Sequence, residues 1–540
     1  MAANMSSFVW LLAAVCMTLN QEYCFANDLK TFLDDDVHYY ETLNYDPQST
    51  FEQQTRRQKR SSLEENPAER KISFSALNRE FRLHLKPDYS IFHNDIQIRH
   101  GNGQPLELNH ETLNFYDGIV ASSASFSKGY CFGSIREGIF DGQILTEEGT
   151  YFVTKIPKRF SNALNETAHS VIYHEIHVKQ SNASHMHGCG LTDSMQKWMD
   201  EVTRPLNVPK DHETNMPSPN TKEASLNDNK SNDLTNDQIG LKKSSQQPTH
   251  NAKETHYEGR RYKRQAGAKK VCSMYIRTDG MLYEAIGKEE YGQNSVKDNW
   301  DDDVIKDKIK GIIHIHVKKL NTIFQNHEFT SEIKTIQFLL LNLKIGDETR
   351  EGCKPFCNRN LDSSPFLEIQ STEDHSKYCL AYAFTHRDWN SGVLGVAWVA
   401  GKGKAGGICE NHKRTQKGLQ SLNTGVVTLM NSGTRVPILK SELTFAHEVG
   451  HNLGSPHDNS PDCVPSGAKN YLMYAYSNSG NHPNNAKFSS CSHRNISKVL
   501  NEVVPDKNIQ GGTTCLENFD GSFCGDGILD ASKFISRTNS

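Results

Sequence analysis

The segment of this chain best suited to chemistry is the eleven-residue stretch His447–His457, which reads HEVGHNLGSPH. On a helix, His447 and His451 lie one turn apart on the same face, so both imidazoles can reach one metal ion. Gly454 lets the backbone leave the helix without Cβ strain, and the returning chain brings His457 in as a third ligand. The pattern predicts a zinc site with three histidine ligands and one further position.

The residue beside the first histidine, Glu448, is the candidate proton carrier. HExxH alone would equally fit a helix with two surface histidines, but the full stretch argues against that alternative. Three neutral imidazoles leave zinc its double positive charge, which brings the pKa of a bound water to about 7. Glu448 would take the proton of that water as it attacks a carbonyl carbon and pass it to the leaving amine. The chemistry that these residues fit is peptide-bond hydrolysis.

One methionine downstream of the histidines is expected to support the site. Met473 follows His457 by sixteen residues and stands in the apolar run Tyr471–Tyr474. A single methionine usually belongs to a core, but the zinc pattern predicts a tight turn at about this distance that places a thioether beneath the metal. We therefore expect Met473 to form such a Met-turn.

The composition indicates a globular secreted protein. The chain has 540 residues, 36% of them hydrophobic, and a net charge of -4; this suffices for roughly two or three domains and gives no electrostatic footprint for nucleic acid. The apolar run Phe8–Leu19 is too short to span a membrane and predicts a signal peptide over residues 1–26, although a charged n-region is missing apart from the amino terminus. No later segment is apolar enough to cross a bilayer. Glycosylation sequons compatible with secretion stand at Asn165, Asn182, Asn229 and Asn495.

The cysteine count requires an explanation for at least one thiol. Removal of the signal peptide leaves eleven of thirteen cysteines, an odd number. Cys189 has a glycine on each side, which lets its backbone approach another surface closely. Because a thiolate is a good zinc ligand, Cys189 could occupy the fourth metal position. The alternative, favoured by composition alone, is a disulfide to Cys131.

The chain divides into regions of different composition. Residues 27–204 include a predicted antiparallel β region from Ile72 to Val178, where apolar residues alternate between Gly-rich turns. Residues 205–264 are rich in Asn, Ser, Thr, Lys and Asp and predict a disordered linker, because they cannot form a packed core. The linker ends in an RxKR tetrapeptide at Arg264, and another stands at Arg57–Arg60. Both predict processing by a proprotein convertase, with a solvated basic patch as the alternative.

Residues 265–515 alternate strands and helices and predict an α/β domain. The run Val393–Ala400 predicts a strand in which Gly395 admits the close approach of another backbone, such as a substrate peptide at a sheet edge. A buried strand with an incidental glycine is the alternative. His314 and His316 face different ways on a helix, so we expect ordinary histidines rather than ligands. The other expected elements are a strand at Val271–Arg277, an amphipathic helix at about Val304–Phe324 and a strand at Ile333–Leu343.

These features meet in a resemblance to a known family. The region Cys379–Cys515 closely resembles the zinc proteases of the disintegrin-and-metalloproteinase (ADAM) family, specifically the Kuzbanian or α-secretase-like branch. The match covers the prodomain, the catalytic domain and a few residues beyond. The segments that carry it are YCLAYAFTHRD (378–388), GVLGVAWV (392–399), GGICE (406–410), SLNTGVVT (421–428), TFAHEVGHNLGSPHD (444–458) and FSSCSHRNIS (488–497).

The resemblance implies a β-rich prodomain followed by an α/β metzincin-type zinc protease domain. It implies one zinc ion held by His447, His451 and His457, with Glu448 as the catalytic residue and Cys189 as the inhibitory prodomain thiol. Family members cleave membrane-anchored proteins near the cell surface, including Notch-type receptors and their ligands. The implied disulfides pair Cys272 with Cys379, Cys409 with Cys515, Cys463 with Cys491, and Cys353 with Cys357 as a local staple.

The resemblance changes at the carboxyl end. Residues 516–540 read as the truncated start of a disintegrin domain, without a cysteine-rich region or a transmembrane helix, so we expect Cys524 to lack its partner. Relatives are anchored at the cell surface, whereas for this chain we expect a secreted zinc endopeptidase, made as a zymogen, that acts on protein substrates such as ectodomains of membrane proteins. The alternative is a soluble, non-proteolytic form that binds substrates or competes with a related protease.

Overall fold

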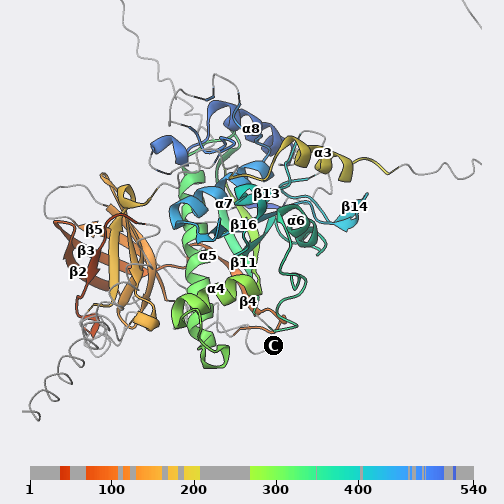
Figure 1. The fold of residues 1–540 in the computed structure, drawn as a ribbon. Helices are drawn as coiled ribbons and strands as arrows, with labels where there is room; N and C mark the ends of the chain where they lie inside the picture. Colours follow the sequence, from red (N-terminus) through yellow and green to blue (C-terminus); the bar gives the residue numbers. More distant parts are fainter. Residues whose placement is uncertain are drawn as a thin grey trace, which may run out of the picture. The chain divides into compact units, whose positions relative to one another are not determined.

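The computed structural model describes residues 37–48, 69–106, 114–121, 129–160, 168–179, 188–206, 268–347, 349–401, 406–459, 463–464, 470–476, 480, 482–503 and 515–518. The expected signal peptide, both RxKR tetrapeptides, the linker from residue 207 onward and Cys524 lie outside these residues. In the described part, no helix combines the length and apolar character that a bilayer crossing requires. Figure 1 follows the chain from its amino-terminal strands to helix α8.

The amino-terminal part forms an antiparallel sheet, with eight strands among the described residues in the order β1-β9-β8-β7-β6-β5-β3-β2. Phe81, Leu83 and Leu85 alternate with more exposed residues along β3 and are buried in one core, as expected where one sheet face covers a core. The β-rich expectation is confirmed. The strands are β1 Glu41–Leu43, β2 Arg70–Ala76, β3 Arg79–Pro87, β5 Phe115–Ala121, β6 Gly129–Arg136, β7 Ile139–Thr146, β8 Gly149–Lys155 and β9 Ser170–His174.

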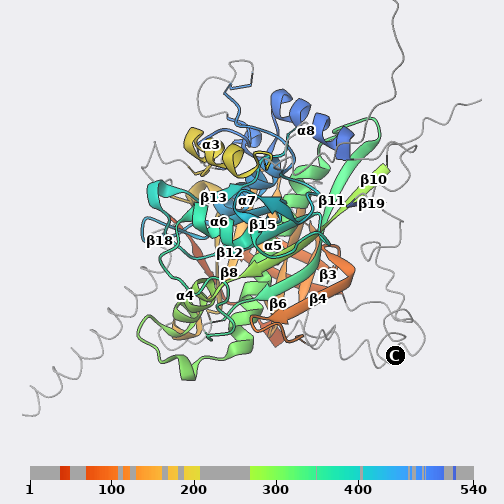
Figure 2. The same cartoon turned by 90° about the vertical axis from the view of Figure 1, so that its right-hand side faces the viewer.

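A second, mixed sheet forms the centre of the α/β part, in the order β13-β16-β12-β10-β11-β4 with β19 also paired to β10. Strands β16, β12, β10 and β11 run parallel, whereas the edge strand β13 is antiparallel to β16. Figure 2 shows the short strand β19 beside β10. These strands are β10 Ala268–Thr278, β11 Ile333–Ile345, β12 Leu380–Thr385, β13 Gly395–Ala397, β16 Thr424–Thr428 and β19 Leu516–Asn518, and two hairpins pair β14 Lys413–Thr415 with β15 Gly418–Gln420 and β17 Met430–Asn431 with β18 Thr434–Arg435.

Strand β4, Phe92–His100, departs from the expected antiparallel region. It leaves its sequence neighbours and runs parallel to β11, with Ile98 opposite Leu343. Phe92 and Ile98 are buried in the same core cluster as Leu343. The β11 edge would otherwise present unpaired backbone groups, and β4 satisfies them. The amino-terminal part therefore contributes a strand to the sheet of the α/β part.

Helices pack on the mixed sheet, among them α6 on β16 and β13. Helix α5 packs on β11 and on α7, and α7 packs on β16 and β13. Asp301 caps α5 by accepting hydrogen bonds from the backbone N–H groups of Asp303 and Val304, and the expected amphipathic helix is confirmed. The helices are α3 Asp193–Val202, α4 Gly280–Tyr291, α5 Asp302–Gln325, α6 Ser363–Ser371, α7 Ile438–Asn452 and α8 Ser490–Val503.

Buried charges join α5 to the amino-terminal part. Lys318 Nζ lies 2.6 Å from Asp88 Oδ2 and 2.9 Å from Asp117 Oδ2, and His314 Nε2 lies 3.3 Å from Asp88 Oδ2. Burial alone would raise the pKa of Asp88, but His314 and Lys318 hold it well below its usual range. Because burying a charge without its partner is costly, these ion pairs favour the docked arrangement. His316 is buried against Ser441 Oγ at 3.0 Å, so both histidines are core residues, as expected.

The disulfides implied by the resemblance are confirmed. All four described pairs are formed: Cys272–Cys379, Cys353–Cys357, Cys409–Cys515 and Cys463–Cys491. Cys131 and Cys189 are both buried and unpaired. The alternative of a Cys131–Cys189 disulfide is therefore not what the structure contains.

Candidate metal centre

Helix α7 and the turn after it carry the histidines of the motif. Phe445, Ala446 and Val449 are buried in the core and fix the helix against the sheet. The helix ends where Gly454 adopts a φ of 98°, with its N–H donating to His451 O at 2.9 Å. An L side chain rarely adopts that conformation, so glycine is needed for the chain to reverse. The reversal brings the following residues back beside the helix.

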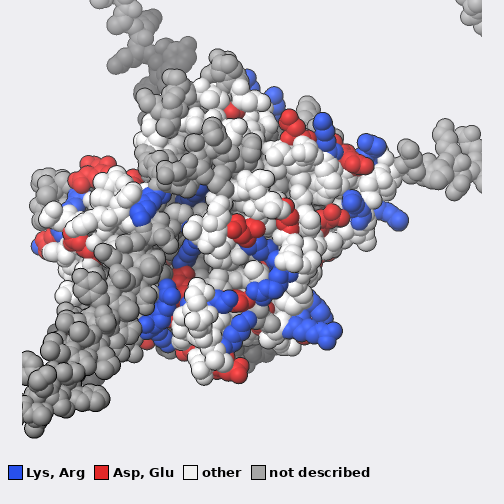
Figure 3. Space-filling view, in the orientation of Figure 1, with Lys and Arg blue, Asp and Glu red and all other residues white. Residues whose placement is uncertain are grey.

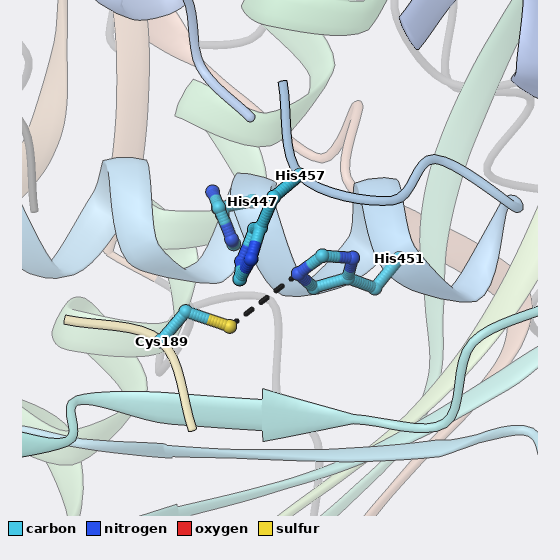
Figure 4. A group of neighbouring side chains, drawn as sticks. All are labelled: Cys189, His447, His451 and His457. Atoms are coloured by element: carbon cyan, nitrogen blue, oxygen red, sulfur yellow. Dashed lines mark hydrogen bonds between the residues drawn. The ribbon is translucent and has the colours of Figure 1, made fainter. Parts of the chain in front are cut away.

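Four candidate ligands converge at this point, as Figure 4 shows. The ligand atoms of Cys189, His447, His451 and His457 all lie within 4.8 Å of one another. Cys189 Sγ is 3.4 Å from His451 Nε2. The structure thus brings together all four residues that the sequence singled out as ligands, although Cys189 lies more than 250 positions from the histidines.

The ring orientation of two histidines fits a metal ligand. His447 Nδ1 lies 2.7 Å from Leu472 O, and His451 Nδ1 lies 2.7 Å from Ser455 O. A hydrogen bond from Nδ1–H to a carbonyl leaves Nε2 with its lone pair free to bind a metal. His447 Nε2 is buried and has no hydrogen-bond partner among the described residues. The two rings therefore present nitrogen lone pairs to the cluster.

Burial keeps these imidazoles neutral near pH 7. It lowers the pKa of His447 to about 4. Burial, together with the repulsion that a protonated His451 ring would meet from protonated His447 and His457, lowers the pKa of His451 well below its usual range. Neutral imidazole is the form that binds a metal. Three nitrogen atoms and one sulfur atom in a compact cluster are a donor set that suits zinc.

The thiol of Cys189 is only 4% exposed. Burial and the neighbouring Glu448 carboxyl raise the pKa of this thiol well above its usual range. A zinc ion among the four ligand atoms would favour the thiolate, because a coordinating thiol is deprotonated outright. In this environment, the thiolate form therefore depends on a cation.

The Cys189 segment also lies against the edge strand β13. Leu394 N donates to Gly188 O at 2.8 Å and Gly190 N donates to Gly395 O at 2.7 Å. Cys189 and Gly395 form a parallel β-bridge. The close backbone approach that Gly395 suggested is thus made by residues 188–190 of the same chain. Strand β13 itself is shorter than the expected Val393–Ala400.

Gly395 has a second neighbour, the fully buried Glu448. A Cβ at position 395 would lie 2.7 Å from Glu448 Cγ, closer than real contacts allow. Burial raises the pKa of Glu448 to about 8, and a divalent cation beside it would oppose this shift by favouring the carboxylate. Because Gly395 has no side chain, the Glu448 side chain can occupy the space beside it.

We expect Gly395→Ala to lower peptide hydrolysis by about ten- to hundredfold while zinc content is retained. The added methyl group would push the Glu448 carboxyl out of place, and a displacement of about 1 Å can cost about 100-fold in rate. Steady-state kinetics and metal analysis of the processed protein check this. Gly311→Ala is the matched control, because a Cβ there meets nothing within 4 Å. Unchanged kcat/KM in Gly395→Ala would contradict the close contact.

Met473 lies beneath α7, where the sequence predicted a supporting turn. It is fully buried, and a Cβ on Gly450 would lie 2.5 Å from Met473 Sδ. Asp458 N donates to Met473 O at 2.8 Å. The turn thus contacts the helix of the first two histidines and the segment that follows His457.

Two supporting residues escaped the sequence analysis. Asn452 Nδ2 donates to Trp398 O at 2.9 Å and to Thr424 O at 3.2 Å, which ties the end of α7 to the sheet. Asp458 Oδ1 accepts hydrogen bonds from Ser489 Oγ at 2.6 Å and Ser492 Oγ at 2.8 Å. Asn452 lies inside the histidine motif and Asp458 directly follows it. Their closeness to the motif was the sequence signal that could have marked them as supporting residues.

The chain matches known metallopeptidases. Metallo-peptidase family M12B, reprolysin-like, matches residues 310–502. Disintegrin and metalloproteinase domain-containing protein 10 of Bos taurus and that of Homo sapiens are each 33% identical over 92% of this chain and 59% of the relative. The homolog of that protein from Caenorhabditis elegans is 32% identical over 93% of this chain and 54% of the relative. The chain thus spans a little over half the length of these curated relatives. It belongs to the disintegrin and metalloproteinase family, in the branch that contains domain-containing protein 10, and its α/β part includes a reprolysin-like metallopeptidase domain.

Proposed function

We propose that this chain is a zinc-dependent endopeptidase made as an inactive precursor, and that it cuts extracellular or membrane-anchored proteins. The observation that carries the proposal is the convergence of the Cys189, His447, His451 and His457 ligand atoms within 4.8 Å. The homology to disintegrin and metalloproteinase domain-containing protein 10 supports protein substrates. By the resemblance to that family, ectodomains such as those of Notch-type receptors and their ligands are the proposed targets.

Glu448 handles the protons of the proposed reaction. When bound, zinc would supply a Lewis acid that lowers the pKa of water and polarises a carbonyl group. The Glu448 carboxylate takes the proton of the attacking water and gives it to the leaving amine. Strand β13 orients an extended substrate, because its edge offers the backbone groups that now pair with residues 188–190.

The Cys189 segment keeps the precursor inactive in this proposal. Its thiolate would fill the fourth zinc position, and its backbone occupies the β13 edge that a substrate needs. Helix α3 continues from this segment and packs on the α/β part, where the Trp198 and Trp398 rings stack with centroids 5.2 Å apart. Cleavage after Arg264 by a proprotein convertase would then allow residues 1–264 to leave.

The proposal is tested by expressing the chain in a secretory host and measuring zinc content and peptide hydrolysis before and after cleavage after Arg264. We expect about one zinc per chain throughout, with hydrolysis appearing after cleavage. A chelator should abolish this hydrolysis and added zinc should restore it. A cleaved chain that binds zinc but hydrolyses no peptide would instead indicate a binding or competitor form. Failure to bind zinc would refute the metal centre.

A further inference from the structure

A small cavity opens beside the metal centre, with a volume of about 20 Å³. Gly188, Cys189, His447 and Glu448 are among the residues that line it, so the cavity adjoins the metal centre. Since Gly188 and Cys189 belong to the segment proposed to leave on activation, the cavity would enlarge in the processed enzyme. A substrate side chain next to the cut bond would then enter it.

The cavity wall contains a lysine beside apolar and aromatic side chains, which include those of the turn at Tyr474–Tyr476. Lys440, Leu443 and Leu472 line the cavity. Lys440 precedes Glu448 by roughly two helical turns, about 12 Å along α7, and both residues line the cavity. The hydroxyl of Thr444, between them, donates to Lys440 O at 2.9 Å and is thus engaged with the helix backbone.

Lys440 is partly buried and carries no ion pair within the described part of the chain. The neighbouring acid Glu442 is fully buried and accepts a hydrogen bond from Gln143 Nε2 instead. Burial lowers the pKa of Lys440, because desolvation disfavours its charged form. An opposite charge brought into the cavity would reverse that penalty.

We propose that Lys440 makes this cavity select a substrate side chain with an apolar stem and a terminal carboxylate, as glutamate has, at a position next to the cut bond. The inference rests on the proposed protease function and names part of its substrate preference. The stem would contact Leu443 and Leu472, and the carboxylate would reach the Lys440 ammonium. Aspartate would suit the cavity less well, because its carboxylate is one methylene closer to the backbone.

The competing explanation is that the Lys440 stem covers apolar surface while its ammonium stays in water. In that case the cavity accepts apolar side chains and ignores charge. Glutamate and glutamine separate the two explanations, since they have the same shape and differ in charge.

The test compares peptides that carry glutamate or glutamine at each position flanking the cut bond, using the full-length chain cleaved after Arg264. We expect glutamate to exceed glutamine in kcat/KM on the order of tenfold at one flanking position, which is the range of a partly desolvated ion pair. Lys440→Met should reduce the ratio to about one, and Lys440→Glu should invert it. Lys334→Met is the matched control, because it removes one positive charge from a side chain that is 55% exposed.

A glutamate-to-glutamine ratio near one in the unmodified protein, or a ratio that persists in Lys440→Met, would overturn the inference. The same peptides are also titrated by fluorescence anisotropy against the cleaved Glu448→Ala protein, with and without Lys440→Met. A tighter Kd for the glutamate peptide that depends on Lys440 supports the inference even if the unmodified protein hydrolyses nothing. Equal binding of both peptides, together with absent hydrolysis, rejects the inference and the proposed function alike. Hydrolysis without glutamate preference rejects the inference only.

Discussion

Replacing Glu448 by glutamine is expected to leave zinc bound and lower kcat/KM of the processed protein by about 10²- to 10⁴-fold, the usual contribution of a general acid–base group. The three histidines are untouched, so the metal stays. The amide has the shape of the carboxylate, which matters because the side chain is fully buried beside Gly395. What it lacks is the ability to accept the proton of water.

The measurement pairs metal analysis with steady-state kinetics on the same preparation. Glu332→Gln, at an exposed position on the chain, is the control for a generic loss of one negative charge. Substantial hydrolysis by a zinc-replete Glu448→Gln protein would place the proton carrier elsewhere. Loss of zinc in that variant would instead give the carboxylate a part in holding the metal.

The parts of the fold that were predictable are those in which local pattern and tertiary role agree. The amphipathic stretch at Val304–Phe324 is found as α5, and the strand at Ile333–Leu343 as β11. Helix α5 buries the face that its periodicity marks as apolar, and the continuous apolar run in β11 is buried on both faces of the sheet. The same holds for the histidine motif, whose geometry is set within one helix and one turn. Local sequence suffices where the partners are close in the chain.

The choice of partner for β4 was not predictable, because it is a non-local decision. The alternation of Phe92–His100 resembles that of its neighbours, yet this strand joins β11, more than 230 positions away. Strand pairing depends on which sheet edge is available and which core has room. A nine-residue segment determines neither of these. The shortness of β13 has a similar cause, since the N–H groups of Leu394 and Ala400 donate to Gly188 O and His451 O.

The metal centre combines a part that local sequence predicts with a part that depends on non-local pairing. The spacing of His447, His451 and His457 fixes three neighbours, whereas Cys189 reaches them only because residues 188–190 pair with β13. From composition alone, a disulfide between Cys189 and Cys131 was the favoured alternative. The structure separates the two thiols by environment, since Cys131 is buried in the core of the antiparallel sheet.

The uncleaved chain with Cys189→Ala is expected to hydrolyse peptides at least about tenfold faster than the unmodified precursor, because loss of each 1.4 kcal/mol of ligation shifts the closed–open equilibrium tenfold. It should still be slower than the cleaved chain. The backbone hydrogen bonds of Gly188 and Gly190 to β13 do not involve the thiol, so the alanine variant keeps them and the substrate edge stays partly covered.

The control for Cys189→Ala is Cys131→Ala, which also removes a buried unpaired thiol but at a site that belongs to no candidate metal cluster among the described residues. Its precursor should remain as inactive as the unmodified one. Zinc content is measured in both variants, since the three histidines should retain the metal without the thiol. A Cys189→Ala precursor that holds zinc and gains no activity would show that the thiol is not what keeps the enzyme latent. In that case the covered edge of β13 would remain as the source of inhibition, and Leu394 and Gly395 would be the positions to probe next.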